Sequence, residues 1–180
     1  AFEITGRDKK VFGVVGDSTF FHSGITGAVD IAYNKGKMVP VVLDNRITGM
    51  TGHQDNPGTG KTLMDEATVE IDPVDILKSI GYKTVRVVDP YDLKAMEEAV
   101  EEAENSKELC ALVTRRPCVL IKGLPPSRKK CIVNRDKCKK CKMCLRVGCP
   151  AVFFKDGASY IDQSMCAGCE ICMQVCKFDA

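Results

Sequence analysis

The first two thirds of the chain alternates short apolar runs with segments of helical period. Four runs rich in valine and leucine have the length of buried strands and cover residues 11–15, 39–43, 84–88 and 109–114. Between them, apolar residues repeat at helical spacing in the segments 24–35, 73–80 and 93–104. Strands that alternate with helices predict an α/β domain in which helical crossovers join the strands of a parallel sheet.

The pattern changes near residue 122, where cysteines and lysines become frequent. Apolar segments on both sides of Asp156-Gly157 predict a β-hairpin within residues 151–162. We expect a first domain over residues 1–122, a linker over 123–130 and a small α+β domain over 131–180. A domain this short cannot build a large core, so bound metal must supply much of its folding free energy.

Eight of the eleven cysteines form two runs in the small domain, one spaced Cys-x2-Cys-x2-Cys-x4-Cys and the other Cys-x2-Cys-x2-Cys-x3-Cys. Three thiolates at intervals of three residues surround one face of a [4Fe-4S] cubane, and a remote cysteine completes it. In a bacterial-type two-cluster ferredoxin the runs exchange their fourth ligands. The predicted ligands are Cys138, Cys141, Cys144 and Cys176 for the first cluster, and Cys149, Cys166, Cys169 and Cys172 for the second.

Structural zinc and disulfides are the alternatives to iron. Zinc sites usually pair CxxC units across a longer loop, and a dense thiol array without a signal peptide suits a reducing cytoplasm. Two departures from the ferredoxin pattern are the four residues before Cys149 and the Lys177 that follows Cys176. The cysteines outside the runs are expected to be small buried hydrophobes: Cys110, Cys118 and Cys131.

Polar residues follow the first two expected strands. Gly16-Asp17-Ser18 ends one strand, and Asp44-Asn45-Arg46 ends the next. The carboxyl ends of parallel strands meet at one edge of a sheet. A carboxylate and a neutral amide oxygen there suit Mg²⁺, which leaves coordination positions for phosphate oxygens. The alternative is an ordinary aspartate at the end of a strand.

Longer segments strengthen the magnesium interpretation. The chain resembles the alpha subunit of indolepyruvate:ferredoxin oxidoreductase in residues 16–24, 43–54, 86–93 and 115–118. The two strand ends also resemble the thiamine diphosphate motif of Gly-Asp-Gly followed by Asn-Asn, in which Ser18 and Asp44 here replace the second glycine and the first asparagine. The family also ends its large subunit in a two-cluster ferredoxin domain, so the resemblance covers nearly the whole chain.

The resemblance implies a set of cofactor ligands. Asp17, Asn45 and the carbonyl oxygen of Ile47 would bind Mg²⁺. The residues that would approach the thiamine diphosphate are Gly16, Asp17, Ser18, Asn45, Thr48, Gly49, Thr51 and Gly52. Glycines in such a loop let backbone amides come close to a diphosphate.

The resemblance also implies an activity. The enzyme would oxidatively decarboxylate an aryl pyruvate with coenzyme A and pass two electrons through two [4Fe-4S] clusters to soluble ferredoxin. There are two alternatives. The chain could be an electron-transfer subunit with a vestigial thiamine domain, or part of an enzyme for pyruvate or another 2-oxo acid. The thiamine domain is expected to be truncated at its N-terminus, and the chain to need a pyrimidine-binding domain and the family's smaller subunit.

Both histidines lie in the expected cofactor loops. His53 would orient the substrate carboxylate or protonate an intermediate, and His22 is a second catalytic candidate. The alternative for both is a hydrogen-bonded loop residue. A nearby stretch, residues 55–62, ends like a P-loop but lacks the leading glycine and the preceding strand, so it is expected to be a solvent-facing turn.

Charge is distributed unevenly along the chain. Residues 1–122 hold 15 basic and 19 acidic side chains, whereas residues 123–180 hold 11 and 5. Two oxidised cubanes with their thiolates add about −4 in total and offset most of this positive excess. The lysines of the first run would steer an acidic redox partner: Lys137, Lys139, Lys140 and Lys142. Few aromatics and no apolar span argue against nucleic acid and membrane partners.

Overall fold

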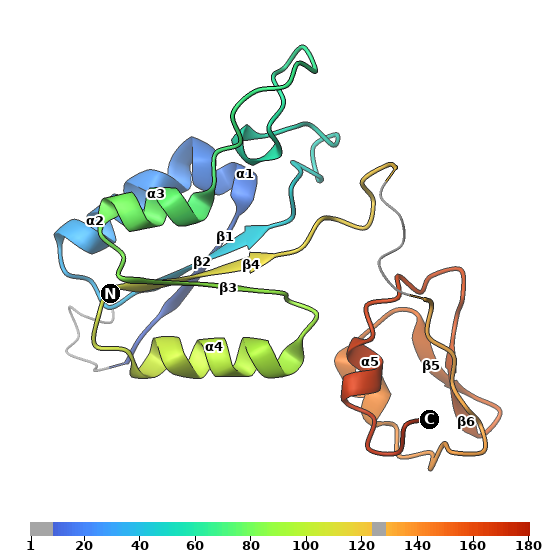
Figure 1. Cartoon of the computed structure of the whole chain (residues 1–180). Coiled ribbons are helices and arrows are strands. Elements are labelled where there is room, and N and C mark those ends of the chain that lie inside the picture. The colour runs from blue at the N-terminus through green and yellow to red at the C-terminus, as the bar shows by residue number, and fades with distance from the viewer. Residues whose placement is uncertain (1–8, 124–128) are drawn as a thin grey trace. The chain divides into compact units, whose positions relative to one another are not determined.

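The computed structural model describes residues 9–123 and 129–180 (Figure 1). The chain forms two compact units, Ala1–Ile121 and Lys122–Ala180, which are called unit 1 and unit 2. The expected linker over residues 123–130 stays a prediction, because residues 124–128 lie outside the described part. No described helix is long and apolar enough to cross a membrane.

Unit 1 is built on a four-stranded parallel sheet in the order β1-β2-β4-β3. Its strands are β1 (Phe12–Gly16), β2 (Val39–Asp44), β3 (Thr84–Val88) and β4 (Cys110–Arg115). The central strands β2 and β4 are almost entirely buried, which explains why their sequences are apolar without alternation. All four expected strands and their parallel pairing are confirmed.

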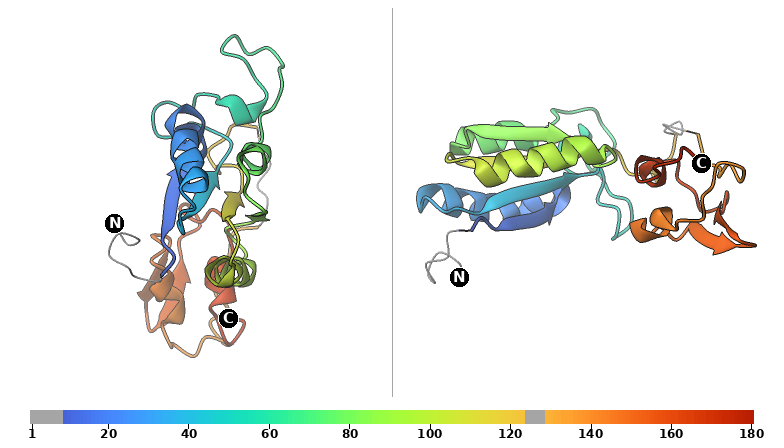
Figure 2. Two further views of the ribbon diagram at one scale, coloured as in Figure 1. Left: turned by 90° about the vertical axis from the view of Figure 1, so that its left-hand side faces the viewer. Right: turned by 90° about the horizontal axis from the view of Figure 1, so that it is seen from below.

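Helices cover both faces of this sheet, as Figures 1 and 2 show. On one face α2 (Ile25–Tyr33) and α3 (Pro73–Ile80) bury Ala28 and Leu77 against Val42 and Val113 of the sheet. On the other face α4 (Leu93–Asn105) buries Ala99 and Ala103 against Val41 and Leu112. The acidic residues of α4 therefore belong to a surface helix, as its sparse apolar stripe predicts.

The first helix begins earlier than expected. A helical turn, α1 (Asp17–Thr19), follows β1 directly, and a π-helical segment, η1 (Phe20–Gly24), joins it to α2. The sequence Gly-Asp-Ser-Thr resembles a turn and has no apolar repeat, so the helix was expected to begin only at Gly24. As a result Asp17 lies at the junction of strand and helix rather than in a loop.

Tyr82 links the end of α3 to α2 and titrates outside its usual range. Its hydroxyl donates a hydrogen bond to the carbonyl oxygen of Ala28 at 3.1 Å, and its side chain is buried. Burial raises the pKa of Tyr82 to about 12 from 10. A raised folded-state pKa gives stability that is fully present below pH 10 and is lost as the pH rises toward 12.

We therefore expect the stabilising effect of Tyr82 over phenylalanine to fall by about 2 kcal/mol across that interval. Urea midpoints of the wild-type chain and Tyr82→Phe, compared at the two ends of the interval, measure it. The difference between the two proteins should shrink at high pH. A difference that is independent of pH would contradict the assignment.

Unit 2 contains an antiparallel hairpin of β5 (Val152–Lys155) and β6 (Ala158–Ile161). Asp156 and Gly157 have φ angles of 51° and 73°, which is the backbone that a two-residue type I′ hairpin requires. The expected hairpin is confirmed. Two short helices complete the unit, the 3₁₀ helix η3 (Met143–Val147) and α5 (Ile171–Gln174).

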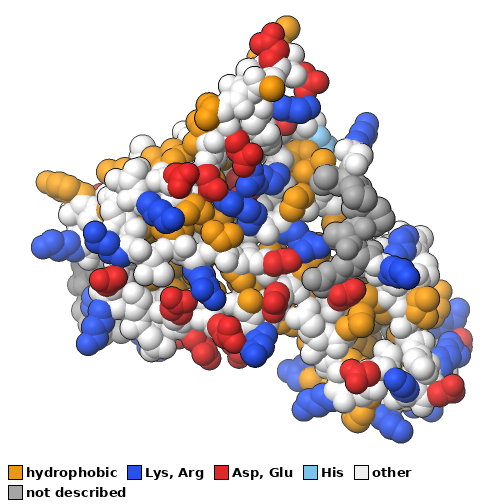
Figure 3. All heavy atoms as spheres, in the orientation of Figure 1, with side chains coloured by type: hydrophobic (Ala, Val, Ile, Leu, Met, Phe, Trp, Pro, Cys, Tyr) orange, Lys and Arg blue, Asp and Glu red, His pale blue; other side chains and the backbone are white. Residues whose placement is uncertain are grey.

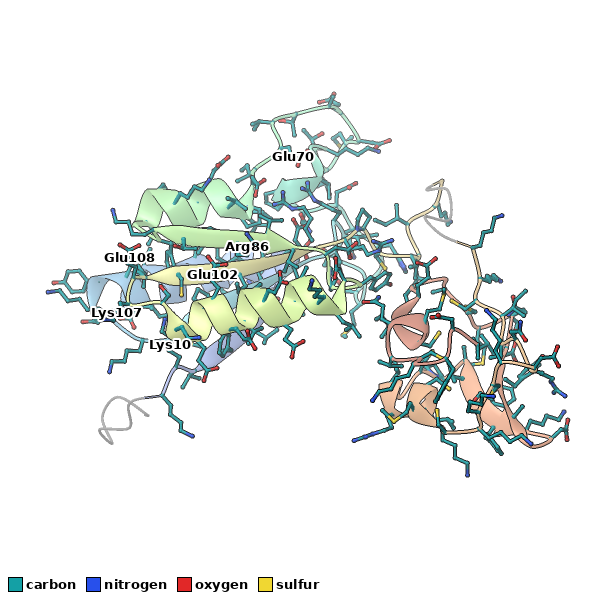
Figure 4. All side chains as sticks on the ribbon, turned by 60° about the horizontal axis from the view of Figure 1, so that its bottom comes forward. Lys10, Glu70, Arg86, Glu102, Lys107 and Glu108 are labelled. Atoms are coloured by element: carbon teal, nitrogen blue, oxygen red, sulfur yellow. The ribbon has the colours of Figure 1, made fainter. Side chains whose placement is uncertain are left out.

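The core of unit 2 is small and rich in sulfur. Its buried members are Cys131, Ala151, Val152 and Ile161. Several cysteines of the two runs pack against this core, and Figure 4 shows sulfur atoms gathered within unit 2. Of the three cysteines outside the runs, Cys110 and Cys131 are buried as expected, whereas Cys118 is only half-buried.

Candidate functional site

Asp17 lies at the carboxyl edge of the sheet and joins the two loops expected there. Its side chain is only 3% exposed. One carboxylate oxygen accepts a hydrogen bond from the backbone N–H of Ser18 at 2.7 Å, and the other accepts one from Arg46 at 3.0 Å. The end of β1 and the segment after β2 therefore meet around a buried carboxylate.

The segment after β2 presents several oxygen atoms beside Asp17. The Asn45 side-chain oxygen accepts a hydrogen bond from the backbone N–H of Ile47 at 3.1 Å. The Thr48 hydroxyl donates to the Ser18 hydroxyl at 3.0 Å and thereby ties the two loops together. Asn45 is exposed at the surface and Ile47 is buried. This arrangement places one carboxylate and neutral oxygens at one edge, which is the donor chemistry that suits Mg²⁺.

The glycine-containing loop beyond Thr48 closes on itself. Thr48 N–H donates to the Gln54 carbonyl oxygen at 2.9 Å, and the Thr51 hydroxyl donates to the Gln54 side chain at 3.1 Å. Gly52 has a φ of 128°, a conformation that disfavours any other residue. Gly49 is half-buried, and Thr51 and Gly52 are exposed, so the loop offers exposed backbone for contact with a ligand.

His22 and His53 are both exposed. His22 lies in the π-helical segment η1, and His53 lies in the glycine-containing loop with a φ of 62°. π-helical segments often occur at functional sites. Neither ring is buried in the fold, so the catalytic roles of both histidines stay predictions.

A network of ion pairs holds the segment after β2 against the sheet. Asp44, only 3% exposed, pairs with the Arg46 Nε at 3.2 Å and with the Arg115 Nε at 2.7 Å. Arg115 also pairs with Asp72 at 2.6 Å, which ties the end of β4 to the cap of α3. Arg46 extends further to Glu70, which Figure 4 marks. Asp44, which stands at the first asparagine of the thiamine diphosphate motif, therefore has a structural role.

Arg115→Gln should destabilise unit 1 by about 2 kcal/mol, because the buried Asp44 would lose a charge-assisted hydrogen bond. Arg86→Gln is the matched control. Arg86 and Glu102, labelled in Figure 4, are about half exposed and 3.8 Å apart, so this change should cost less than about 0.5 kcal/mol. Thermal unfolding measures both, and equal effects would refute the buried network.

Asn56 is a candidate that the sequence did not reveal. Residues 55–62 were expected to form a solvent-facing turn, yet Asn56 and Gly58 are buried. The Asn56 side-chain oxygen accepts a hydrogen bond from Gly58 N–H at 2.9 Å. Its side-chain nitrogen is buried without a hydrogen-bond partner among the described residues. The Gly58 carbonyl oxygen accepts from Arg46 at 2.7 Å, so Asn56 belongs to the same loop assembly.

The four predicted ligands of the first cluster line one cavity of unit 2, which Cys131 and Cys172 also line: Cys138, Cys141, Cys144 and Cys176. Cys141 is exposed and the other three are half-buried. Hydrogen bonds from the backbone of Ser159 and Lys140 lower the pKa of Cys138. The Cys144 thiol lies 3.2 Å from the Ser159 hydroxyl. Hydrogen bonds to the Cys138 sulfur favour its thiolate, the form that binds iron in a cluster.

The second set lies against the core of unit 2. Cys149, Cys166 and Cys172 pack against it beside Cys131. Burial, followed by the nearby Cys131, raises the pKa of Cys172 to about 12, and Cys169 adds to the shift. A coordinated metal deprotonates such a thiol outright. Cys131 is thus a ninth thiol, beside Cys172 and in the lining of the first cavity, which spacing alone did not indicate.

Within residues 9–123 and 129–180, no group of three or more His, Cys, Asp or Glu side chains is arranged to hold a single metal ion. Neither expected site consists of three such side chains around one ion. A cubane spreads its thiolates over four irons, and the expected magnesium site uses one carboxylate with neutral oxygens. The sulfur atoms in unit 2 fit iron–sulfur clusters, and the oxygen atoms at the edge of the sheet fit Mg²⁺.

Comparison with known proteins assigns the larger unit. The family model of the thiamine pyrophosphate enzyme C-terminal TPP binding domain matches residues 1–114. The chain belongs to the thiamine pyrophosphate enzyme family. The family model of the 4Fe-4S binding domain matches residues 159–180, which contain the second cysteine run. This family member therefore joins a thiamine diphosphate-binding domain to an iron–sulfur domain.

Its relatives share both parts. The indolepyruvate oxidoreductase subunit IorA of Pyrococcus abyssi is 40% identical over 98% of this chain. The subunits of the same name from Thermococcus kodakarensis and Archaeoglobus fulgidus are 38% and 35% identical over 97% and 94% of it. The chain spans 28% of the length of each of these relatives. The resemblance expected from the motifs is confirmed.

Proposed function

We propose that this chain is the cofactor-binding and electron-transfer part of a thiamine diphosphate-dependent 2-oxoacid:ferredoxin oxidoreductase. Its substrate is an aryl pyruvate such as indolepyruvate, and its products are carbon dioxide and an acyl-coenzyme A. The observation that supports this most is the convergence of Asp17 with residues 45–48 at one edge of the sheet, in a chain that also carries eight spaced cysteines.

Each residue of the edge has a physical task in this proposal. Asp17, Asn45 and the Ile47 carbonyl oxygen hold Mg²⁺, and the glycine-containing loop presents backbone amides to the diphosphate. Thiamine diphosphate, when bound, supplies the electron sink for decarboxylation of the 2-oxo acid. Thr48, hydrogen-bonded to Ser18 at 3.0 Å, keeps the two cofactor loops in register.

Unit 2 supplies the path for electrons. Two [4Fe-4S] clusters held by the two sets of cysteines accept electrons one at a time, so an oxidation of two electrons needs two such steps. Soluble ferredoxin then receives them. Low-potential clusters of this kind make ferredoxin a suitable acceptor and imply sensitivity to oxygen.

The complete enzyme needs further parts. The relatives are more than three times as long as this chain, which spans 28% of each, and their printed name describes a subunit. We propose that the rest of the large subunit supplies the pyrimidine-binding domain and that a smaller subunit completes the complex in the cytoplasm. His53 and His22 are proposed to contact the substrate.

Substrate oxidation by the complete complex tests this function. With coenzyme A, Mg²⁺ and thiamine diphosphate under anaerobic conditions, indolepyruvate should reduce ferredoxin faster than pyruvate does. A preference for pyruvate would retain the 2-oxoacid chemistry and reject the aryl substrate. Ferredoxin reduction by neither acid, in a complex whose clusters respond to dithionite, would favour the alternative of a vestigial thiamine domain.

A further inference from the structure

The side chains around the two predicted cluster sites differ in charge. Within the first run, the sequence Cys138-Lys-Lys-Cys141-Lys-Met-Cys144 places three lysines between ligands. Within the second, Cys166-Ala-Gly-Cys169-Glu-Ile-Cys172 places a glutamate there and no lysine. Residues 135–146, around the three clustered ligands of the first site, hold six basic side chains and one acidic one, whereas residues 162–172, around those of the second, hold two acidic side chains and no basic one. Cationic side chains are therefore concentrated at one site.

The same site reaches the surface. Of the eight predicted ligands, all of which lie in the described ranges, Cys141 is the exposed one and the others are half-buried. Its flanking residues Lys140 and Lys142 are exposed as well. Figure 3 shows Lys and Arg side chains spread over the visible face of unit 2.

The backbone fixes the lysines beside the ligands. Lys140 and Lys142 have φ angles of 58° and 59°, so the residues on both sides of Cys141 have a left-handed backbone conformation. The Lys142 ammonium lies 4.7 Å from the centre of the Phe154 ring, a cation–π contact that holds it over the hairpin. This positive charge is part of the fold around the first site.

The second site has an acidic neighbour and no exposed ligand. Cys166 and Cys172 pack against the small core of unit 2, as Cys144 of the first site does, and the four second-site ligands are half-buried. Glu170, between two of them, is half-buried as well. A negative charge and burial both disfavour an added electron on a cluster, whereas nearby cations and exposure favour it. The two sites should therefore differ in reduction potential, with the first site higher.

We propose that electrons leave the protein at the Cys138–Cys141–Cys144–Cys176 site. The surrounding lysine surface, Lys137, Lys139, Lys140 and Lys142, docks an acidic soluble iron–sulfur acceptor. One electron, without a proton, passes from the reduced [4Fe-4S] cluster of this site to the oxidised cluster of the acceptor. The inference rests on the proposed function, since it specifies where that enzyme meets its electron acceptor.

The potential difference gives the transfer a direction. An electron on the second, more negative site moves downhill to the first, which the acceptor can approach. Attraction between the lysine surface and an acidic partner raises the association rate and makes it dependent on salt. The lysines thus raise the reduction potential of the cluster and also attract the acidic partner.

The test compares two double variants of the full-length complex with equal change in charge. Lys139→Gln/Lys140→Gln removes two cations between ligands of the first site. Lys129→Gln/Lys155→Gln, the matched control, removes two exposed cations of unit 2 outside both cysteine runs. The probe is a soluble, acidic two-[4Fe-4S] ferredoxin, whose Kd is measured at low and high salt. Electron paramagnetic resonance follows both clusters of the variants during a redox titration.

We expect the first variant to weaken ferredoxin binding at low salt on the order of tenfold, with a flatter salt dependence. It should change the reduction potential of only one cluster, the one of higher potential, and should make that potential more negative. The control should change affinity less than about twofold and move neither signal. Equal effects of the two variants, or a shift confined to the signal of lower potential, would overturn the inference.

The Kd for ferredoxin and the reduction potentials of the clusters can be measured whether or not the proposed function is correct. Dithionite reduces the clusters and ferredoxin binds without a 2-oxo acid, so a complex that fails to oxidise indolepyruvate still reports both quantities. An iron content that is equal in the two variants shows that the clusters assemble in both.

Discussion

Asp17→Ala is expected to abolish magnesium-dependent binding of thiamine diphosphate while leaving the iron content unchanged. Asp17 contributes the one carboxylate of the proposed metal site and joins the loops after β1 and β2 through Ser18 and Arg46. Removing this side chain takes away both a metal ligand and the acceptor of the hydrogen bond from the backbone N–H of Arg46. Loss of even an outer partner of a metal ligand costs about 10–100-fold in affinity, so the loss here should reach about 100-fold or more.

Isothermal titration of thiamine diphosphate in the presence of Mg²⁺ measures the effect on the full-length complex. Asp75→Ala, at an exposed aspartate of α3, is the matched control and should bind the cofactor normally. Wild-type affinity in Asp17→Ala would reject the assignment of Asp17 as a ligand. Iron that is lost along with the cofactor would show that the substitution disturbs more than the edge of the sheet.

The second large effect concerns the cysteines. Cys144→Ala should lower the iron content from about eight to about four atoms per chain, because the first cluster loses a ligand that lines its cavity. Unit 2 should also become less resistant to unfolding, since metal ligation supplies much of the folding free energy of so small a unit. Anaerobic iron and sulfide analysis with proteolysis of unit 2 measures both changes.

Cys118→Ala is the control for this change, since Cys118 is half-buried but lies outside both runs. It should keep about eight irons. An unchanged iron content in Cys144→Ala would contradict the assignment of the first cluster. Zinc in place of iron in the wild-type protein would contradict the assignment of both.

Pattern alone identified the strands and most helices, because the four apolar runs lie where buried parallel strands occur and α3 begins at the expected Pro73 after the capping Asp72. The start of the first helix was missed. Gly16, Asp17 and Ser18 carry no helical period, so no local signal shows that the helix begins directly at the strand. The ends of β1 and β2 could be predicted to lie side by side, because the carboxyl ends of parallel strands meet at one edge of the sheet.

Other features of the site depend on contacts between residues far apart in sequence. The pairing of Asp44 with Arg115, across 71 residues, has no local sequence signal, and neither has the approach of Cys131 to Cys172. Residues 55–62 lack the leading glycine and the preceding strand of a P-loop and are therefore expected to form a solvent-facing turn, yet Asn56 is buried. Tertiary packing overrides local composition at such positions.

The most direct test of the central claim is whether a 2-oxo acid reduces the clusters through thiamine diphosphate. The complete complex, freed of thiamine diphosphate and kept anaerobic, is mixed with indolepyruvate and coenzyme A while the visible absorbance of the clusters is followed. We expect bleaching only after thiamine diphosphate and Mg²⁺ are added, and none in Asp17→Ala. Bleaching without the cofactor, or no bleaching in a complex that dithionite bleaches, would contradict the account.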